Sequence, residues 1–296
     1  MTWWGADSQG AEGVRLKDTV LAALLLAPSA VIFTLFFFVP LYRLVDLGLH
    51  EQNRFGTEER WVGWSQYRDV LTGDEFTTGL QHTVLFVVYT VPIGVVLGIL
   101  LAVAANRPLR GIKVFQTIFA STVASSVAVA SVIFLVLINP QVGYFRDIGF
   151  FSLSDPDTAL RGVALSSLWQ NLGLTFVIVL AALQSVPEEL YEVSLLDGYG
   201  PARRFFKVTL PLISPTLLFL VVVLVIFGFQ AFAQVEILTS GGPAGATETL
   251  VFKIFQAQQP ASQGEGAVMA LGLFVITALV TLAQFALLER RVQYGR

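Results

Sequence analysis

Six long apolar runs alternate with polar segments along the 296-residue chain. A run of about 20 apolar residues is long enough to cross a bilayer as a helix. We therefore expect an all-α membrane protein with one six-helix transmembrane domain, residues 19–289, between an N-terminal segment, 1–18, and a tail, 290–296. The expected spans are about 19–42, 84–105, 114–138, 162–185, 212–235 and 266–288.

The basic residues gather on one side of this layout. If both termini lie inside, 11 of the 18 Lys and Arg residues but only 8 of the 21 Asp and Glu residues fall in inner segments. Loops rich in Lys and Arg remain in the cytoplasm. The first run is too long for the core of a signal peptide, so we expect it to be retained. The pattern predicts cytoplasmic termini and an acidic outer face.

Composition narrows the class of protein. Hydrophobic residues make up 55% of the chain, charged residues 13%, and mean hydropathy is +0.71. The sequence has no Cys and only two His, so no metal site is expected. It also has no phosphate-binding loop motif and no group of residues suited to catalysis. We expect a non-catalytic membrane protein that does not bind nucleic acid.

None of the six apolar runs contains Asp, Glu, Lys or Arg. A proton-coupled carrier usually needs a titrating residue on its transport path, and many ion channels use rings of charged side chains. A stand-alone secondary carrier is therefore a distant alternative, as is a membrane scaffold or receptor. Energy for uphill transport would have to enter through a cytoplasmic contact.

The inner segment 187–211 has a regular helical design. Residues 185–188, Ser-Val-Pro-Glu, fit a capping box that begins a helix. Asp197-Gly198 predicts the end of that helix, and Gly200-Pro201 the start of another. The result is a helix, a bend and a helix. Within the first helix, one apolar stripe is expected to pack, and its members are Leu190, Val193 and Leu196.

This segment resembles the glutamate-alanine-alanine loop of permease subunits in binding-protein-dependent ABC importers, with Val193 and Ser194 in place of the two alanines. In that family the loop forms coupling helices that sit in a cleft of the cytoplasmic ATPase. An ordinary amphipathic loop is the alternative. The resemblance implies an ATPase contact made by Glu189, Glu192, Asp197, Gly198, Arg203, Leu210 and Pro211.

An outer segment carries a second resemblance. Thr239 to Pro243 is rich in turn residues and cannot continue a helix. In the family a similar segment forms a loop that receives the substrate-binding protein, which implies docking at Gly241, Gly242 and Pro243. His82 stands where the family commonly has asparagine.

Polar side chains inside two apolar runs are candidates for a translocation path. Such groups are costly in lipid, so they should face the bundle interior or water. Hydrogen bonding between helices, with packing of the neighbouring phenylalanines, explains them equally well. The candidates are Trp169, Gln170, Asn171, Gly228, Gln230 and Gln234.

The likeness is closest to the carbohydrate group of these importers, which includes the maltose, trehalose and sn-glycerol-3-phosphate systems. It implies a prokaryotic plasma-membrane location, a second permease in a heterodimer, an ATPase dimer that uses ATP and Mg, and an extracytoplasmic binding protein. The solute it implies is sn-glycerol 3-phosphate, a glycerophosphodiester such as glycerophosphocholine, or a related sugar or polyol. A phosphate favours Arg or Lys, and no span supplies one. A neutral di- or oligosaccharide such as trehalose or maltose is therefore the alternative.

Overall fold

The computed structural model describes residues 8–288 except 54, 57, 58 and 108. The expected tail, 290–296, and the first seven residues lie outside the described residues. The described chain is almost entirely helical, with one small antiparallel sheet in which His50 pairs with Trp61. The expected all-α fold is therefore confirmed, with this hairpin as a minor addition.

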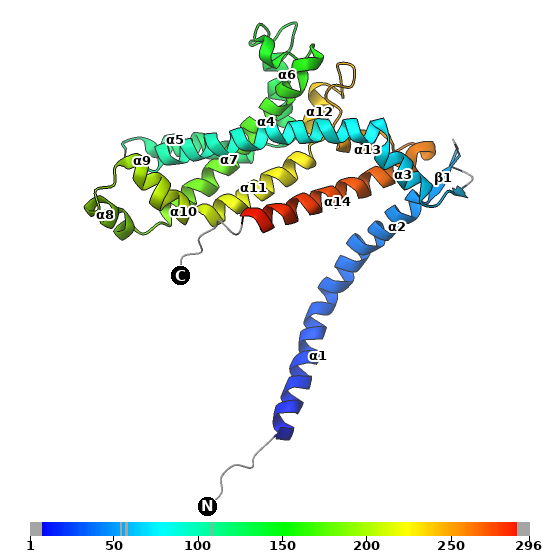
Figure 1. Ribbon diagram of the computed structural model, residues 1–296, viewed down its shortest axis with the longest axis horizontal. Coiled ribbons are helices and arrows are strands. Elements are labelled where there is room, and N and C mark those ends of the chain that lie inside the picture. Colours follow the sequence, from blue (N-terminus) through cyan, green and yellow to red (C-terminus); the bar gives the residue numbers. More distant parts are fainter. Residues whose placement is uncertain (1–7, 54, 57–58, 108, 289–296) are drawn as a thin grey trace, which may run out of the picture.

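The helices follow one another with short connections (Figure 1). Before the hairpin come α1 (Ser8–Phe33), the π-helical turn η1 (Thr34–Phe38) and α2 (Val39–Gly48). The hairpin consists of β1 (His50–Gln52) and β2 (Glu59–Trp61). The first half of the bundle contains α3 (Ser65–Thr72), α4 (Asp74–Ala105), α5 (Ile112–Ser121), η2 (Thr122–Ala124), α6 (Val127–Ile138), η3 (Gly149–Phe151) and α7 (Pro156–Gln184). The second half contains α8 (Glu188–Leu196), α9 (Pro201–Arg204), η4 (Phe205–Thr209), α10 (Leu210–Leu212), α11 (Ser214–Phe229), α12 (Ala233–Leu238), α13 (Leu250–Gln256), η5 (Pro260–Ser262) and α14 (Gln263–Leu288).

Four segments of the described chain are long and apolar enough to cross a membrane, and two bent pairs raise the number to as many as six. The four are residues 19–48, 74–105, 156–184 and 260–287. The helix of 74–105 begins ten residues before the span expected at 84. Asp74 and Glu75 occupy its first turn, where carboxylates favour the positive end of the helix dipole. Hydropathy alone cannot detect this polar extension.

The third expected span is not one continuous helix. Residues 112–124 and 127–138 meet at 106°, with Ser125 and Ser126 between them. Ser126 has extended backbone angles, and its side chain accepts a hydrogen bond from the Val129 N–H at 3.2 Å. The serine therefore begins a new helix rather than continuing the old one.

The fifth expected span, 212–235, is also interrupted. Residues 201–212 and 214–229 form a pair bent by 69° at Ile213. The helix α11 then ends at Phe229, and α12 restarts at Ala233. The three residues between them leave the helical path, so the polar residues on either side can face the same space.

The core is built on the long helices α4 and α7. An added Cβ at Gly98 of α4 would lie 2.1 Å from Thr175 Cγ2 of α7, so the two helices are in close contact there. Phe176 and Val179, which follow Thr175 on α7, are fully buried in the hydrophobic core. Small residues at such crossings let helix backbones approach.

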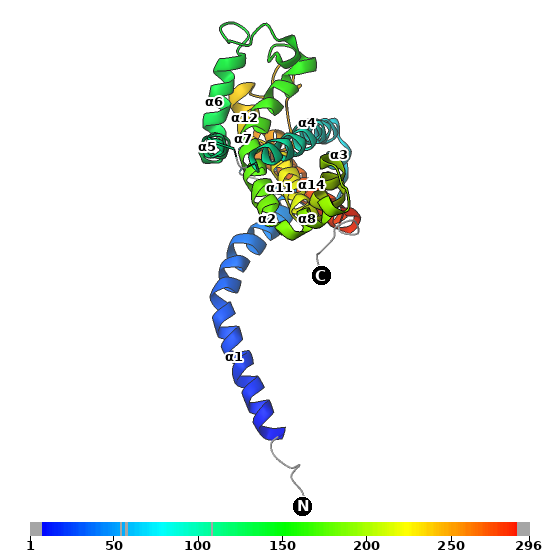
Figure 2. The ribbon, with the colours of Figure 1, turned by 90° about the vertical axis from the view of Figure 1, so that its left-hand side faces the viewer.

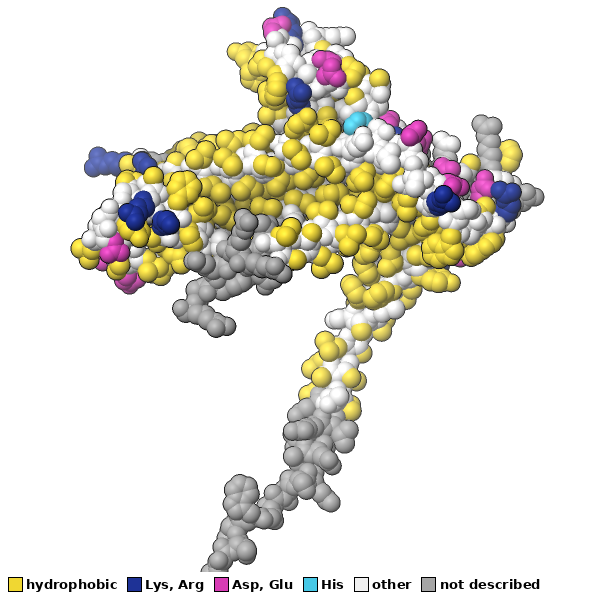
Figure 3. All heavy atoms as spheres, viewed as in Figure 1, with side chains coloured by type: hydrophobic (Ala, Val, Ile, Leu, Met, Phe, Trp, Pro, Cys, Tyr) yellow, Lys and Arg dark blue, Asp and Glu magenta, His cyan; other side chains and the backbone are white. Residues whose placement is uncertain are grey.

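The first helix stands apart from this bundle. Both ribbon views show α1 projecting away from the remaining helices (Figures 1 and 2). In its apolar stretch none of the residues from 19 to 39 is buried, and Phe36 is 79% exposed. Figure 3 shows apolar side chains covering the sides of the bundle, while charged side chains gather at its ends. This distribution suits a lipid environment.

Candidate functional site

The segment 187–211 forms the predicted helix, bend and helix. The helix α8 ends at Leu196, and two backbone bonds close it: Gly198 N–H donates to Leu195 O, and Tyr199 N–H donates to Ser194 O. Gly198 has a φ of +72°. This is the Schellman arrangement, in which glycine takes the left-handed conformation. The predicted end at Asp197-Gly198 and the restart at Pro201 are both confirmed.

The predicted capping box at residues 185–188 is wrong. Ser185 closes α7 instead, because its hydroxyl donates to Ala182 O at 2.8 Å. Pro187 occupies the N-cap of α8 without a side-chain hydrogen bond. Glu188 and Glu189 fill the first turn, where their charges favour the helix dipole.

The apolar stripe of α8 does not pack within the described chain. Leu190, Val193 and Leu196 are 39%, 54% and 88% exposed. A different face anchors the helix: Ser194 is buried, and the Tyr191 hydroxyl accepts a hydrogen bond from Thr209 Oγ1 at 3.4 Å. The stripe is therefore free to meet another protein.

The predicted coupling residues divide into two groups. The exposed group lies on α8, the bend and α9, and consists of Glu189, Glu192, Asp197, Gly198 and Arg203. Leu210 and Pro211 are half-buried where the chain returns to the bundle. The guanidinium of Arg203 lies 4.3 Å from the centre of the Tyr199 ring, a cation–π contact that holds α9 against the bend.

A cavity of about 490 Å³ lies among α4, α6, α7, α11 and α12. It is lined by Gln170, Asn171, Gly228, Gln230 and Gln234, so five of the six predicted path residues meet there. Trp169 does not line it. Its ring packs on Phe134 instead, with ring centroids 5.8 Å apart. Adjacent residues of a helix point in different directions, so Trp169 and Gln170 face different sides of α7.

The cavity also contains residues that the sequence did not single out. Phe86, Thr90 and Gly94 come from α4, and Ser167 comes from α7. The aromatic rings of Phe227 and Phe232 line it together with the amide groups. Serine and threonine could not be identified from the sequence as cavity residues, because their hydroxyls can also bond to carbonyl groups of their own helix. Thr90 Oγ1 does so, donating to Phe86 O at 2.8 Å.

No charged side chain of the described chain lines this cavity. Its polar groups are amides and hydroxyls, and its apolar groups are largely aromatic and aliphatic. Nor does the described part of the chain contain a group of three His, Cys, Asp or Glu residues that could hold a metal ion. The cavity therefore offers hydrogen-bonding groups together with aromatic and aliphatic surface.

The loop with Gly241, Gly242 and Pro243 is tightly held. Gly241 has a φ of +84° and is buried against Phe252. The Thr247 hydroxyl donates to Gly242 O at 2.9 Å. The loop therefore has a defined shape, which a docking surface requires.

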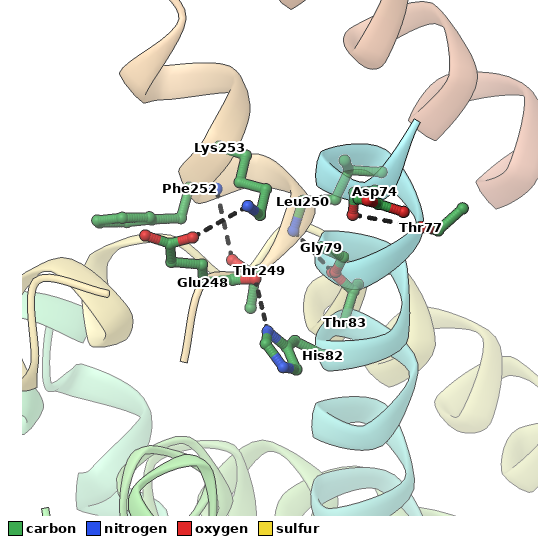
Figure 4. A network of polar contacts seen from close by, with 10 residues as sticks. All are labelled: Asp74, Thr77, Gly79, His82, Thr83, Glu248, Thr249, Leu250, Phe252 and Lys253. Atoms are coloured by element: carbon green, nitrogen blue, oxygen red, sulfur yellow. Dashed lines mark hydrogen bonds and ion pairs between the residues drawn. The ribbon is translucent and has the colours of Figure 1, made fainter. Parts of the chain in front are cut away.

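Figure 4 shows how this loop is attached to α4. The Leu250 N–H donates to Thr83 Oγ1 at 2.9 Å, and the His82 Nδ1–H donates to Glu248 O at 3.1 Å. An ion pair at 3.0 Å joins Lys253 and Glu248. The imidazole of His82 thus acts as a hydrogen-bond donor to the loop, and an asparagine amide could supply a donor as well.

Curated relatives match this chain over nearly its full length. The sn-glycerol-3-phosphate transport system permease protein UgpA of Agrobacterium fabrum is 32% identical and covers 96% of this chain and 100% of its own. The protein of the same name from Yersinia pestis bv. Antiqua (strain Antiqua) is 31% identical and covers 93% and 96%.

Solved structures share the fold. A bacterial ABC transporter involved in the import of the acidic polysaccharide alginate matches with a TM-score of 0.74 and 21% identity, over 95% of this chain and 99% of that chain. The alginate transporter in complex with its alginate pentasaccharide-bound periplasmic protein matches with a TM-score of 0.75 and 22% identity, over 95% and 97%.

The family model of binding-protein-dependent transport system inner membrane components matches residues 94–294. In this family the permease is non-catalytic, and the ATPase is a partner subunit. The matched range contains the segment 187–211, the loop with Gly241, Gly242 and Pro243, and most of the residues that line the cavity. This chain therefore belongs to the family of binding-protein-dependent transport system inner membrane components, the permeases of ABC importers.

Proposed function

We propose that this chain forms half of the translocation path for sn-glycerol 3-phosphate or a glycerophosphodiester such as glycerophosphocholine. The observation that carries the proposal is the cavity of about 490 Å³ within the bundle, with amide and hydroxyl groups from α4, α7 and α12 and from Gln230 between α11 and α12. The relatives at 31–32% identity, named as sn-glycerol-3-phosphate permeases, support the choice of solute.

Coupling to ATP hydrolysis uses α8. Its exposed stripe, Leu190, Val193 and Leu196, docks into a cleft of a cytoplasmic ATPase subunit, and Glu192 adds a charge-assisted contact. The partner ATPase dimer binds ATP and Mg. Its closure moves α8 and, through the buried Ser194 and Tyr191–Thr209 contacts, the spans attached to it.

A second permease, of a different sequence, completes the path. The helix α1 buries none of its apolar side chains from 19 to 33 within the chain, and exposed apolar surface of this extent marks an interface with protein or lipid. The second permease and the surrounding lipid together cover it.

The chain lies in a prokaryotic plasma membrane with six spans and both termini in the cytoplasm. Under this layout the segment 187–211 is inside and the loop at Gly241–Pro243 is outside. The excess of Lys and Arg in the inner segments supports it. The outer loop, beside an open groove of about 420 Å³ lined by His82, Glu248 and Lys253, receives the binding protein.

A neutral di- or oligosaccharide such as trehalose or maltose is the second candidate solute. The absence of Lys and Arg from the described lining of the cavity favours it, as do the amides and aromatic rings that suit sugar hydroxyls and faces.

Uptake by the purified importer decides between the two. The complex of this chain with its co-purifying permease, ATPase and binding protein is placed in liposomes that contain ATP. We expect uptake of labelled sn-glycerol 3-phosphate or glycerophosphocholine. Uptake of labelled trehalose or maltose, without uptake of either phosphate compound, would contradict the proposed solute and support the neutral sugar. Uptake by this chain without an ATPase would contradict the importer mechanism.

A further inference from the structure

The break in the third span opens onto the central cavity. The helix α6 starts at Val127, which lines the cavity, and leaves the preceding helix at 106°. Ser126 stands at its N-cap and satisfies two N–H groups: its hydroxyl accepts from Val129, and its carbonyl accepts from Ala130 at 3.0 Å. The N-terminal end of a 12-residue helix therefore lies at the cavity wall.

Two N–H groups remain at this end. Those of Val127 and Ala128 have no hydrogen-bond acceptor within the described residues. The first N–H groups of a helix have no partner inside it, and the aligned peptide dipoles place partial positive charge there. Such an end attracts anions without needing a Lys or Arg.

Ser167 on α7 gives a second, independent sign of a ligand. It lines the same cavity and is only 2% exposed, yet its hydroxyl has no hydrogen-bond partner in the described structure. A buried hydroxyl without a partner is costly, which a bound acceptor would remedy. One turn further along α7, Gln170 Nε2 donates to Ser125 O at 3.5 Å, which holds this face of α7 against the break.

We propose that the phosphate group of the transported solute binds between the N-terminus of α6 and the Ser167 hydroxyl. The N–H group of Val127 and the hydroxyl of Ser167 donate to its oxygens, while Gln170, Gln230 and Gln234 remain for the glycerol hydroxyls. The proposal rests on the solute proposed above. It explains how a path without Lys or Arg could accept an anion.

The first test removes one backbone donor. Proline is well tolerated at the first position of a helix, and Ser126 already has the extended conformation that precedes proline. Val127→Pro therefore deletes the N–H while keeping α6, and Val127→Ala, which shortens the side chain but keeps the N–H, is its control. In the reconstituted importer, we expect uptake of sn-glycerol 3-phosphate to fall about tenfold in the proline variant relative to the alanine variant.

The second test removes the hydroxyl. Ser167→Ala deletes the buried donor, and Ser166→Ala is a matched control, because Ser166 is its neighbour, is equally buried and unpartnered in the described structure, and does not line the cavity. Neither change removes a hydrogen bond from the part of the chain that the structure describes. We expect an approximately fivefold or greater loss of uptake for Ser167→Ala and wild-type uptake for Ser166→Ala.

Co-purification of the ATPase and ATP hydrolysis without solute report whether each variant assembles. If Val127→Pro fails to assemble, Ser167→Ala decides the matter. If wild type takes up sn-glycerol 3-phosphate and both Val127→Pro and Ser167→Ala match their controls, the phosphate site is refuted while the proposed function stands. If wild type carries only neutral sugars, the proposed function fails and the phosphate site fails with it.

Discussion

The backbone angle φ at Gly198 determines the bend between α8 and α9 in the segment 187–211. Its φ is +72°, and an added Cβ would meet nothing within 4 Å, so a larger residue fits in space but strains the backbone. We expect Gly198→Val to cost about 1–2 kcal/mol at the bend and to weaken ATPase binding and uptake. Gly198→Asn should stay close to wild type, because asparagine tolerates this conformation. Equal ATPase co-purification by the two variants would contradict the role of the bend.

Single residues differ in how far the sequence specifies their roles. Gly198 was predictable because few residues other than glycine suit a left-handed helix end. Ser185 was not, because a serine hydroxyl can cap the next helix or bond back to the previous one, and here it bonds back to Ala182. The exposure of Leu196 could not be predicted either. A periodic apolar stripe indicates that a helix packs against a partner, but not whether that partner belongs to the same chain.

At His82 and Thr83 two neighbouring side chains hold the outer loop. His82→Asn should retain wild-type stimulation of ATP hydrolysis by the binding protein, because an amide can still donate to Glu248 O. Thr83→Val should lower it, since the buried Leu250 N–H loses its acceptor at a cost of about 1–3 kcal/mol. The measurement is ATPase activity with and without loaded binding protein. A normal response from Thr83→Val would show that this attachment is dispensable.

At the scale of elements, the contact between α4 and α7 can be tested with two glycines one turn apart. At Gly98 an added Cβ would lie 2.1 Å from Thr175, whereas at Gly94 it would meet nothing within 4 Å. We expect Gly98→Ala to lower the melting temperature of the purified chain in detergent, because the helices must separate. Gly94→Ala should leave it unchanged or raise it, since alanine favours helix. Equal melting temperatures would mean that the crossing adjusts freely.

Hydropathy located the helices but not their breaks. A proline or glycine would mark a kink, yet the third span breaks at Ser125 and Ser126, which are also compatible with a continuous membrane helix. The break between Phe229 and Ala233 follows Gly228, but glycine is common in membrane helices and does not by itself predict an interruption. These two interruptions border the cavity, so the part of the candidate site that depends on them could not be predicted from periodicity.

At the scale of the whole molecule, the six-span layout predicts which surfaces face each side of the membrane. The natural chain has no cysteine, so each introduced thiol is unique within it. Leu196→Cys places a thiol at an 88% exposed position of the coupling segment, and Tyr144→Cys places one at an 85% exposed position between the third and fourth expected spans. In intact spheroplasts, a membrane-impermeant maleimide should label the chain through Cys at 144 but not through Cys at 196.

Opening the membrane and removing the ATPase should make both positions reactive, so that an unlabelled thiol in sealed spheroplasts reports its side of the membrane and not burial by the docked ATPase. The wild-type chain, without cysteine, provides the background. Labelling of the Leu196→Cys variant in sealed spheroplasts would place the exposed stripe of α8 outside, where no ATPase or ATP is available. That single result would remove the physical basis for coupling through α8, because the stripe and the energy source would then lie on opposite sides of the membrane.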